Sequence, residues 1–273
     1  TATVDSIPLI AASIMSKKLA SGSDKIVLDV TVGSGAFMKN VEDAIQLAKR
    51  MVEIGERAGR QTVAVLTNMD VPLGVAVGND IEVIEAIETL QGNGPKDFEE
   101  ICVEFASQML YLGKIADMQK CRDMVKDTIY TGKGIDKLAE MVKAQGGDES
   151  YIYHPEKFVE APYKQEFFMK KTAYISFMDT EKCGKTSVVL GAGRETKEST
   201  IDPKAGIRFY HKTGEFVEEG EILAVLYASD PEKLTDAVKY LETVYQYSDD
   251  PVTPMKEIIA YVTKDGIKRM DAR

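Results

Sequence analysis

Two polar side chains, Ser13 and Lys17, are the residues whose types and spacing most suit chemistry. They lie four residues apart in the segment 6–21, where isoleucines recur at helical spacing. At 3.6 residues per turn, the hydroxyl and the ammonium lie within about 40° of each other on one side of that helix. Both groups donate hydrogen bonds and could hold a planar polar ligand, such as an amide or imide ring. A solvated serine and lysine on an amphipathic helix explain the same pattern, and the residues alone favour this second interpretation.

The glycine-rich loop after the apolar run that begins at Ile26 is a second candidate. A run without apolar and polar alternation is typical of a buried parallel strand. Open α/β sheets bind their ligands beyond the carboxyl ends of such strands, and Gly33 and Gly35 would allow a close approach of the backbone. The third glycine of the dinucleotide fingerprint is absent, since Phe37 and Met38 follow. A ligand-binding loop and a tight turn between strand and helix therefore both stay open.

Composition limits the class of protein. The chain has 273 residues, enough for two domains with their own cores, and a formal net charge of -10. That charge argues against a nucleic-acid surface, which needs clustered lysine and arginine. Three widely spaced cysteines and only two histidines favour a reducing compartment without a zinc site or a Ser-His-Asp triad. No apolar run approaches the length of a transmembrane helix, so we expect a cytoplasmic protein with no membrane partner.

The elements around the candidates alternate between helix and strand. Asp5 and Ser6 are N-cap residues for the first helix, with Pro8 in its first turn. The expected order is helix 6–21, strand 26–30, a helix near 40–58 and strand 62–66. This is a βαβ unit with parallel strands. Because two strands do not make a stable sheet and the chain begins at Thr1, we expect a fragment whose remaining strands lie upstream.

The pattern changes further along the chain. The expected elements are a loop over 68–79, helices over 80–90, 97–112 and 119–144, a linker around 146–162, short β-rich runs that include 173–175 and 187–190, and a helix near 231–244. Glycine turns around short strands over 213–226 resemble the barrel-sandwich folds of biotinyl and lipoyl carriers. No lysine lies at the hairpin tip where such carriers are modified, which favours a scaffold role.

Four segments together resemble the thymidine phosphorylase and pyrimidine-nucleoside phosphorylase family: 3–18, 32–38, 92–95 and 190–194. The resemblance extends nearly end to end along the chain but covers only roughly the last three-fifths of a family member. It implies an α/β fold: a piece of a large α/β lobe with parallel strands and one small-lobe helix, followed by a C-terminal α+β domain of barrel-sandwich type. The implied boundaries are 1–22 for the small lobe, 23–150 for the large lobe, 151–165 for a linker and 166–273 for the C-terminal domain.

The implied activity is the reversible phosphorolysis of uridine, thymidine or deoxyuridine. Phosphate attacks the anomeric carbon and releases the free base and (deoxy)ribose 1-phosphate. Ser13 and Lys17 match the family's pyrimidine-binding pair, and Lys17 would also be catalytic, because it can stabilise the negative charge that develops on the departing base. The family's base-binding arginine and its phosphate ligands would precede Thr1. The resemblance therefore implies that residues 1–273 alone are inactive and that the glycine loop is a packing turn.

The resemblance also implies a structural potassium ion. Its matching ligands are the backbone carbonyls of Leu73 and Ala76 and the carboxylate of Glu85, and oxygen ligands of this kind suit a hard cation. It further implies a homodimer formed through the upstream part. One departure is Thr31, which stands where family members commonly have lysine.

Two other readings stay open from the sequence. One is a phosphoribosyltransferase of the anthranilate type, which shares the lobe plan but would need a diphosphate and Mg²⁺ site that no acidic pair supports. The other is a non-catalytic protein in which the C-terminal domain acts as a binding or assembly module.

Overall fold

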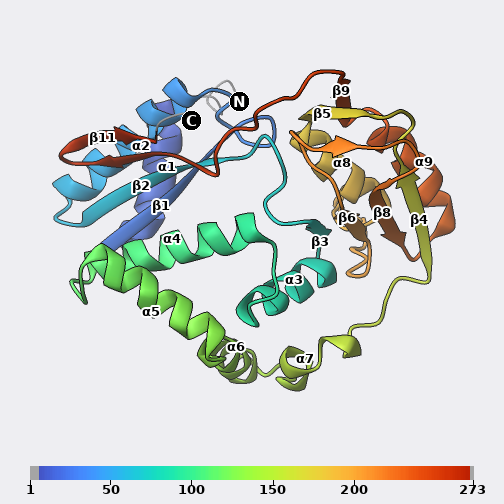
Figure 1. Cartoon of the computed structure of the whole chain (residues 1–273). Coiled ribbons are helices and arrows are strands. Elements are labelled where there is room, and N and C mark those ends of the chain that lie inside the picture. Colours follow the sequence, from blue (N-terminus) through green and yellow to red (C-terminus); the bar gives the residue numbers. More distant parts are fainter. Residues whose placement is uncertain (1–5, 271–273) are drawn as a thin grey trace. The chain divides into compact units, whose positions relative to one another are not determined.

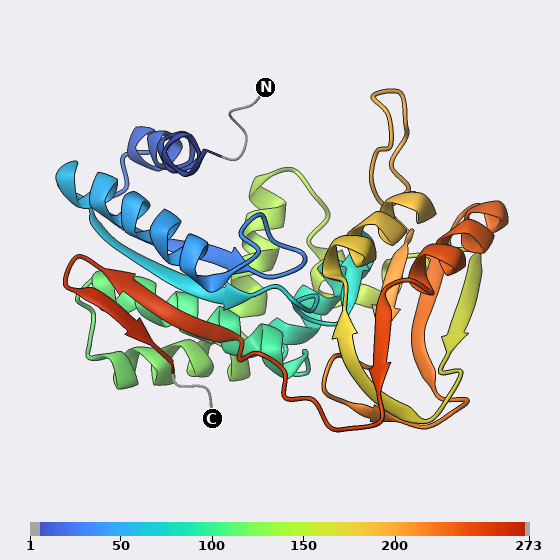
Figure 2. The same cartoon turned by 90° about the horizontal axis from the view of Figure 1, so that it is seen from above.

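The computed structural model describes residues 6–270 of the chain (Figures 1 and 2). It divides into two compact units. The first unit consists of the chain up to Met69, Glu100–Val125 and the chain from Met255 on, and the second consists of Asp70–Glu99 and Lys126–Pro254. Among the described residues, no helix has the length and apolar character needed to cross a membrane. The division at residues 22, 150 and 165, which rests on the family resemblance, stays a prediction.

The first unit is built on a four-stranded sheet in the order β1-β2-β10-β11. Its strands are β1 (Lys25–Val32), β2 (Gln61–Asn68), β10 (Ile258–Thr263) and β11 (Gly266–Arg269). The predicted parallel pairing of β1 and β2 is confirmed. β2 is buried along almost its whole length and therefore needs a neighbour on each side. The C-terminal hairpin supplies one, since β10 runs antiparallel to β2. Two further strands of this sheet thus come from the C-terminal end of the chain, and the expectation of more strands upstream stays a prediction.

Two helices, α1 (Ile7–Ala20) and α2 (Val41–Arg57), pack against each other, and α2 lies on the sheet. The Asn40 side chain caps α2 by accepting a hydrogen bond from the Asp43 amide at 2.9 Å. Ser6 occupies the N-cap position of α1 but makes no capping hydrogen bond, and Asp5 lies outside the described residues. Five apolar residues at helical spacing on α2 are buried: Ala44, Leu47, Ala48, Met51 and Val52.

Two helices that follow, α4 (Lys96–Leu112) and α5 (Met118–Tyr130), carry a polar network around the buried Glu104 in the first unit. Arg122 donates to the Glu104 carboxylate at 2.8 Å. Burial alone would raise the pKa of Glu104, but hydrogen bonds from Gln108, Arg122 and Tyr261 outweigh it and lower that pKa. The network thus ties α4 and α5 to strand β10.

The predicted helix over 119–144 is wrong. The structure has two helices there, α5 and α6 (Lys133–Ala144), with Gly132 between them at φ +78°. A glycine in this left-handed conformation ends one helix and redirects the chain before the next. The apolar periodicity continues across the break, which explains why the pattern alone did not show it.

The second unit contains two small antiparallel sheets. One has the order β3-β6-β8-β4 and the other the order β7-β5-β9. The strands are β3 (Ala76–Gly78), β4 (Tyr163–Phe168), β5 (Ala173–Met178), β6 (Gly206–Phe209), β7 (Phe216–Val217), β8 (Ile222–Ala228) and β9 (Tyr245–Ser248). Within the described residues the sheets form no closed barrel. Their shared core includes Ile175, Ile207, Phe209, Leu223 and Leu226.

Helices α8 (Thr180–Leu190) and α9 (Pro231–Leu241) pack together beside these sheets. The predicted β-rich run at 187–190 is wrong, because these residues form the last turn of α8. Asp179 caps the start of that helix, and Gly191 at φ +110° ends it. The unit also contains α3 (Asp80–Leu90), the short helix α7 (Ser150–Tyr153) and a 3₁₀ turn at Pro155–Lys157, the last two inside the expected linker.

Candidate functional site

The predicted base-binding pair, Ser13 and Lys17, lies on the exposed side of α1, while Ala11 and Met15 on the same helix are buried. The backbone carbonyl of Ser13 accepts a hydrogen bond from the Ser16 hydroxyl at 3.0 Å. Neither the Ser13 hydroxyl nor the Lys17 ammonium is bound to another described residue. Both donors are therefore accessible to a ligand from one side of α1.

The glycine loop uses its backbone amides internally. The Gly33 amide donates to the Met38 carbonyl at 3.0 Å, the Gly35 amide to the Met69 carbonyl at 3.0 Å and the Ala36 amide to the Gly33 carbonyl at 3.1 Å. A phosphate cradle needs such amides to point at the ligand. These contacts therefore favour the packing turn over a phosphate-binding loop.

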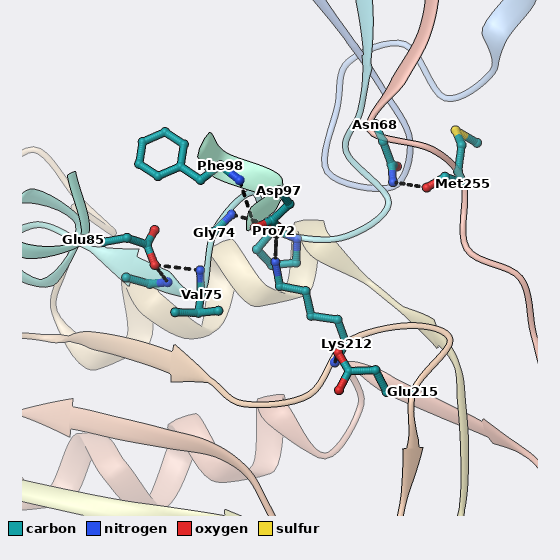
Figure 3. Close-up of polar contacts among 11 residues, drawn as sticks. Asn68, Pro72, Gly74, Val75, Glu85, Asp97, Phe98, Lys212, Glu215 and Met255 are labelled. Carbon is teal, nitrogen blue, oxygen red and sulfur yellow. Dashed lines mark hydrogen bonds and ion pairs between the residues drawn. The ribbon is translucent and has the colours of Figure 1, made fainter. Parts of the chain in front are cut away.

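A second polar cluster surrounds Glu85 of α3 (Figure 3). Its side chain is only 5% exposed. One carboxylate oxygen, Oε1, accepts hydrogen bonds from the amides of Val75 at 2.8 Å and Ala76 at 3.0 Å. The other, Oε2, lies against Gly74, where an added Cβ would come within 2.1 Å of it. Gly74 also has φ +69°. The turn that carries Leu73 and Ala76 thus wraps closely around the Glu85 carboxylate.

The electrostatics of Glu85 favour a nearby cation. Burial raises the pKa of Glu85, the two amide donors and the Lys212 ammonium oppose that rise, and Asp97 adds to it. Oε2 accepts no hydrogen bond from any described residue. The oxygen of a buried carboxylate of this kind is a ligand that suits a hard monovalent or divalent cation. The three predicted ligand residues are therefore brought together in one turn and its adjoining helix.

Sequence reasoning missed a second carboxylate that holds the same turn. The Lys212 ammonium lies 2.6 Å from Asp97 Oδ2 and donates to the Pro72 carbonyl at 2.9 Å. Asp97 Oδ2 also accepts from the Gly74 amide at 3.2 Å. The side chains of Lys212 and Asp97 are only 15% and 20% exposed. Figure 3 shows Glu85 and the Asp97–Lys212 pair on either side of the turn.

Little in the sequence pointed to this ion pair. Asp97 falls in the first turn of α4, where an acidic residue has the ordinary role of complementing the helix dipole. Lys212 lies 115 residues further along the chain. The antiparallel pairing of β3 with β6 helps to bring the two segments together.

Two protein-family models match this chain. A family model described as the glycosyl transferase family a/b domain matches residues 1–135. Another, described as the pyrimidine nucleoside phosphorylase C-terminal domain, matches residues 174–248. The chain therefore combines a glycosyl transferase a/b domain with a pyrimidine nucleoside phosphorylase C-terminal domain.

Curated relatives narrow the class further. Proteins named pyrimidine-nucleoside phosphorylase from Staphylococcus aureus strains USA300, NCTC 8325 / PS 47 and bovine RF122 are each 46% identical over 255 residues, which is 93% of this chain. The chain belongs to the pyrimidine-nucleoside phosphorylase family. It spans 59% of the length of these relatives.

Proposed function

We propose that the whole protein catalyses the reversible phosphorolysis of pyrimidine nucleosides, namely uridine, thymidine and deoxyuridine, with phosphate as co-substrate. The observation that carries the proposal is the 46% identity to proteins named for this activity, over 93% of the chain. It is supported by the pair of accessible donors on α1, which suits a pyrimidine ring edge. The proposal includes a homodimer in the cytoplasm, as the family resemblance implies.

The two α1 side chains have separate roles in this proposal. Ser13 holds the edge of the pyrimidine ring by hydrogen bonding. Lys17 stabilises the negative charge that spreads over N1, O2 and O4 of the base as the glycosidic bond breaks. Because that charge is larger in the transition state than in the bound nucleoside, Lys17 contributes mainly to the rate of bond cleavage.

The cluster around Glu85 is proposed to hold a structural potassium ion. Its ligands would be the Glu85 carboxylate and the carbonyls of Leu73 and Ala76. The close wrapping of the turn around the carboxylate supports this assignment. The ion would supply positive charge to a buried carboxylate, while the amides of Val75 and Ala76 keep the Glu85 side chain oriented.

The test is an assay of the intact protein with uridine, in the presence and absence of inorganic phosphate, with uridine 5′-phosphate, diphosphate and Mg²⁺ as a parallel arm. We expect uracil and ribose 1-phosphate to form in equal amounts, and only when phosphate is present. Base release that required diphosphate would indicate a phosphoribosyltransferase instead. No base release in any arm would indicate a non-catalytic module, and either result would overturn the proposal.

A further inference from the structure

The second unit contains a cavity of about 210 Å³ that none of the assigned residues of the base site lines. It lies between α3, the segment 158–161 and the strands β3, β6 and β8, whose arrangement can be followed in Figure 1. Much of its wall is apolar: Ile81, Ile84, Phe158 and Val159. A water molecule needs about 10–15 Å³ by this measure, whereas drug-sized ligands occupy pockets of roughly 300 Å³ or more. The space therefore suits a molecule with a single ring.

Strand pairing places two polar side chains together in the cavity wall. Arg208 of β6 pairs with Val225 of β8, and Gly206 pairs with Tyr227 two residues further along. Side chains two residues apart point to the same face of a sheet, so Arg208 and Tyr227 are diagonal neighbours. The alternate residues of these strands, Ile207 and Leu226, point into the core on the other face. The cavity thus has an arginine and a tyrosine on one wall.

These two side chains are hydrogen-bond donors that lack a close acceptor. Arg208, whose side chain is 44% exposed, forms a long ion pair with Glu88, with 4.0 Å between Nη2 and the carboxylate oxygen Oε2. Neither the Arg208 guanidinium nor the Tyr227 hydroxyl makes a hydrogen bond to a described residue. Tyr227 is partly buried, and burial raises the pKa of its hydroxyl, so that the group is a neutral donor at pH 7.

Besides Arg208, the wall carries one lysine, Lys204, and two carboxylates, those of Asp80 and Glu160. Burial raises the pKa of Asp80, and the Lys204 ammonium opposes this rise, which makes Lys204 the counter-charge of Asp80. Glu160 lies near Tyr227 and, by its charge, adds to the rise in the Tyr227 pKa, which Arg208 opposes. Arg208 is therefore the cation of this wall best placed to bind an incoming anion.

We propose that this cavity binds a small carboxylate with a planar apolar body, such as an aromatic carboxylate. The Arg208 guanidinium would donate two parallel hydrogen bonds to the carboxylate, and the Tyr227 hydroxyl would donate a third. The ring would lie against Ile81, Ile84 and Phe158. A neutral ring would offer the Arg208 guanidinium no charged acceptor, and an inorganic anion would leave the apolar wall uncovered. The inference does not rest on the proposed catalytic function, because neither Ser13 nor Lys17 contributes to the cavity.

The experiment is a titration of the intact protein with 4-fluorobenzoate, followed by ¹⁹F NMR. The parallel ligands are 4-fluorobenzamide, which keeps the ring without the charge, and inorganic phosphate, which keeps charge without the ring. We expect saturable binding of 4-fluorobenzoate and binding weaker by about tenfold or more for the amide. Phosphate should not displace the bound 4-fluorobenzoate. Absence of saturable binding, or equal affinity for the amide, would overturn the proposal.

Variants assign the binding to this cavity. Arg208→Met should weaken 4-fluorobenzoate binding by about tenfold or more, since a charge-assisted bidentate contact is lost. Ile84→Phe should weaken it by filling the space without changing the charges. The control is Arg269→Met on β11, where a surface arginine bound to Glu42 at 2.6 Å lies outside the cavity. If Arg208→Met and Ile84→Phe both bind as tightly as the Arg269→Met control, the site lies elsewhere and the proposal fails.

Discussion

Replacing Lys212 by methionine should destabilise the second unit by about 2–3 kcal/mol. Exposed ion pairs contribute about 0–1 kcal/mol, whereas breaking a fully buried pair costs about 3–5 kcal/mol. The Lys212–Asp97 pair lies between these limits, with side chains 15% and 20% exposed and an Nζ–Oδ2 distance of 2.6 Å. The substitution also removes the donor to the Pro72 carbonyl. It also leaves the Asp97 carboxylate without its counter-charge. We therefore expect a cost closer to that of breaking a buried ion pair than to that of losing an exposed one.

Urea unfolding of the intact protein, followed by circular dichroism, measures this cost. The midpoint should fall in Lys212→Met while the slope with denaturant stays unchanged. Lys239→Met is the matched control, because Lys239 pairs with Asp236 at 2.9 Å with side chains 67% and 65% exposed. That change should cost less than about 0.5 kcal/mol. Equal midpoints for the two variants would refute the reasoning that burial makes the Lys212 pair strong.

Three further changes test the polar clusters of the intact protein. Replacing potassium by tetramethylammonium should lower the melting temperature, because the folded protein then loses the free energy of binding potassium. Glu85→Gln should remove most of the difference between the two salts. Equal melting temperatures of the unchanged protein in both salts would contradict the potassium assignment. Gly74→Ala should lower the free energy of unfolding in urea by about 3 kcal/mol, because the added Cβ would meet the Glu85 carboxylate. Gly59 has a similar φ and open space around it, so Gly59→Ala should lower that free energy by only about 1 kcal/mol. The lowered pKa of Glu104 means that its contribution to stability is present above its ordinary value of 4.5 and is lost as the pH falls below it. Glu104→Gln should therefore flatten the loss of stability in acid, and an unchanged acid profile would contradict this.

Local patterns predicted the first unit well. The apolar spacing of α1 and α2 indicates helices, and the apolar residues of β1 around Asp29 indicate a strand. The parallel pairing of β1 and β2 then follows from the helix between them. The antiparallel pairing of β10 with β2 could not be predicted, because nothing in the residues of β10 specifies β2 as its partner.

Predictions failed where a single glycine or cap outweighed the apolar pattern. Gly132 divides a continuous helical pattern into α5 and α6, and Asp179 and Gly191 enclose a helix whose last residues favour β structure by type. In the candidate site, Glu85 was identified through the family resemblance. The Asp97–Lys212 pair could not be identified, because its two residues meet only through long-range strand pairing.

The most direct test of the central claim compares two neighbouring lysines of α1 in the intact protein. Lys17 and Lys18 are both exposed, and they point about 100° apart around the helix. With saturating uridine and phosphate, Lys17→Ala should lower kcat by about 100-fold or more, as expected for the loss of a group that stabilises transition-state charge. Lys18→Ala should leave kcat within about twofold, as expected for an exposed side chain away from the base. A Lys17→Ala enzyme with the same kcat as Lys18→Ala would contradict the assignment of this face of α1 to the departing base.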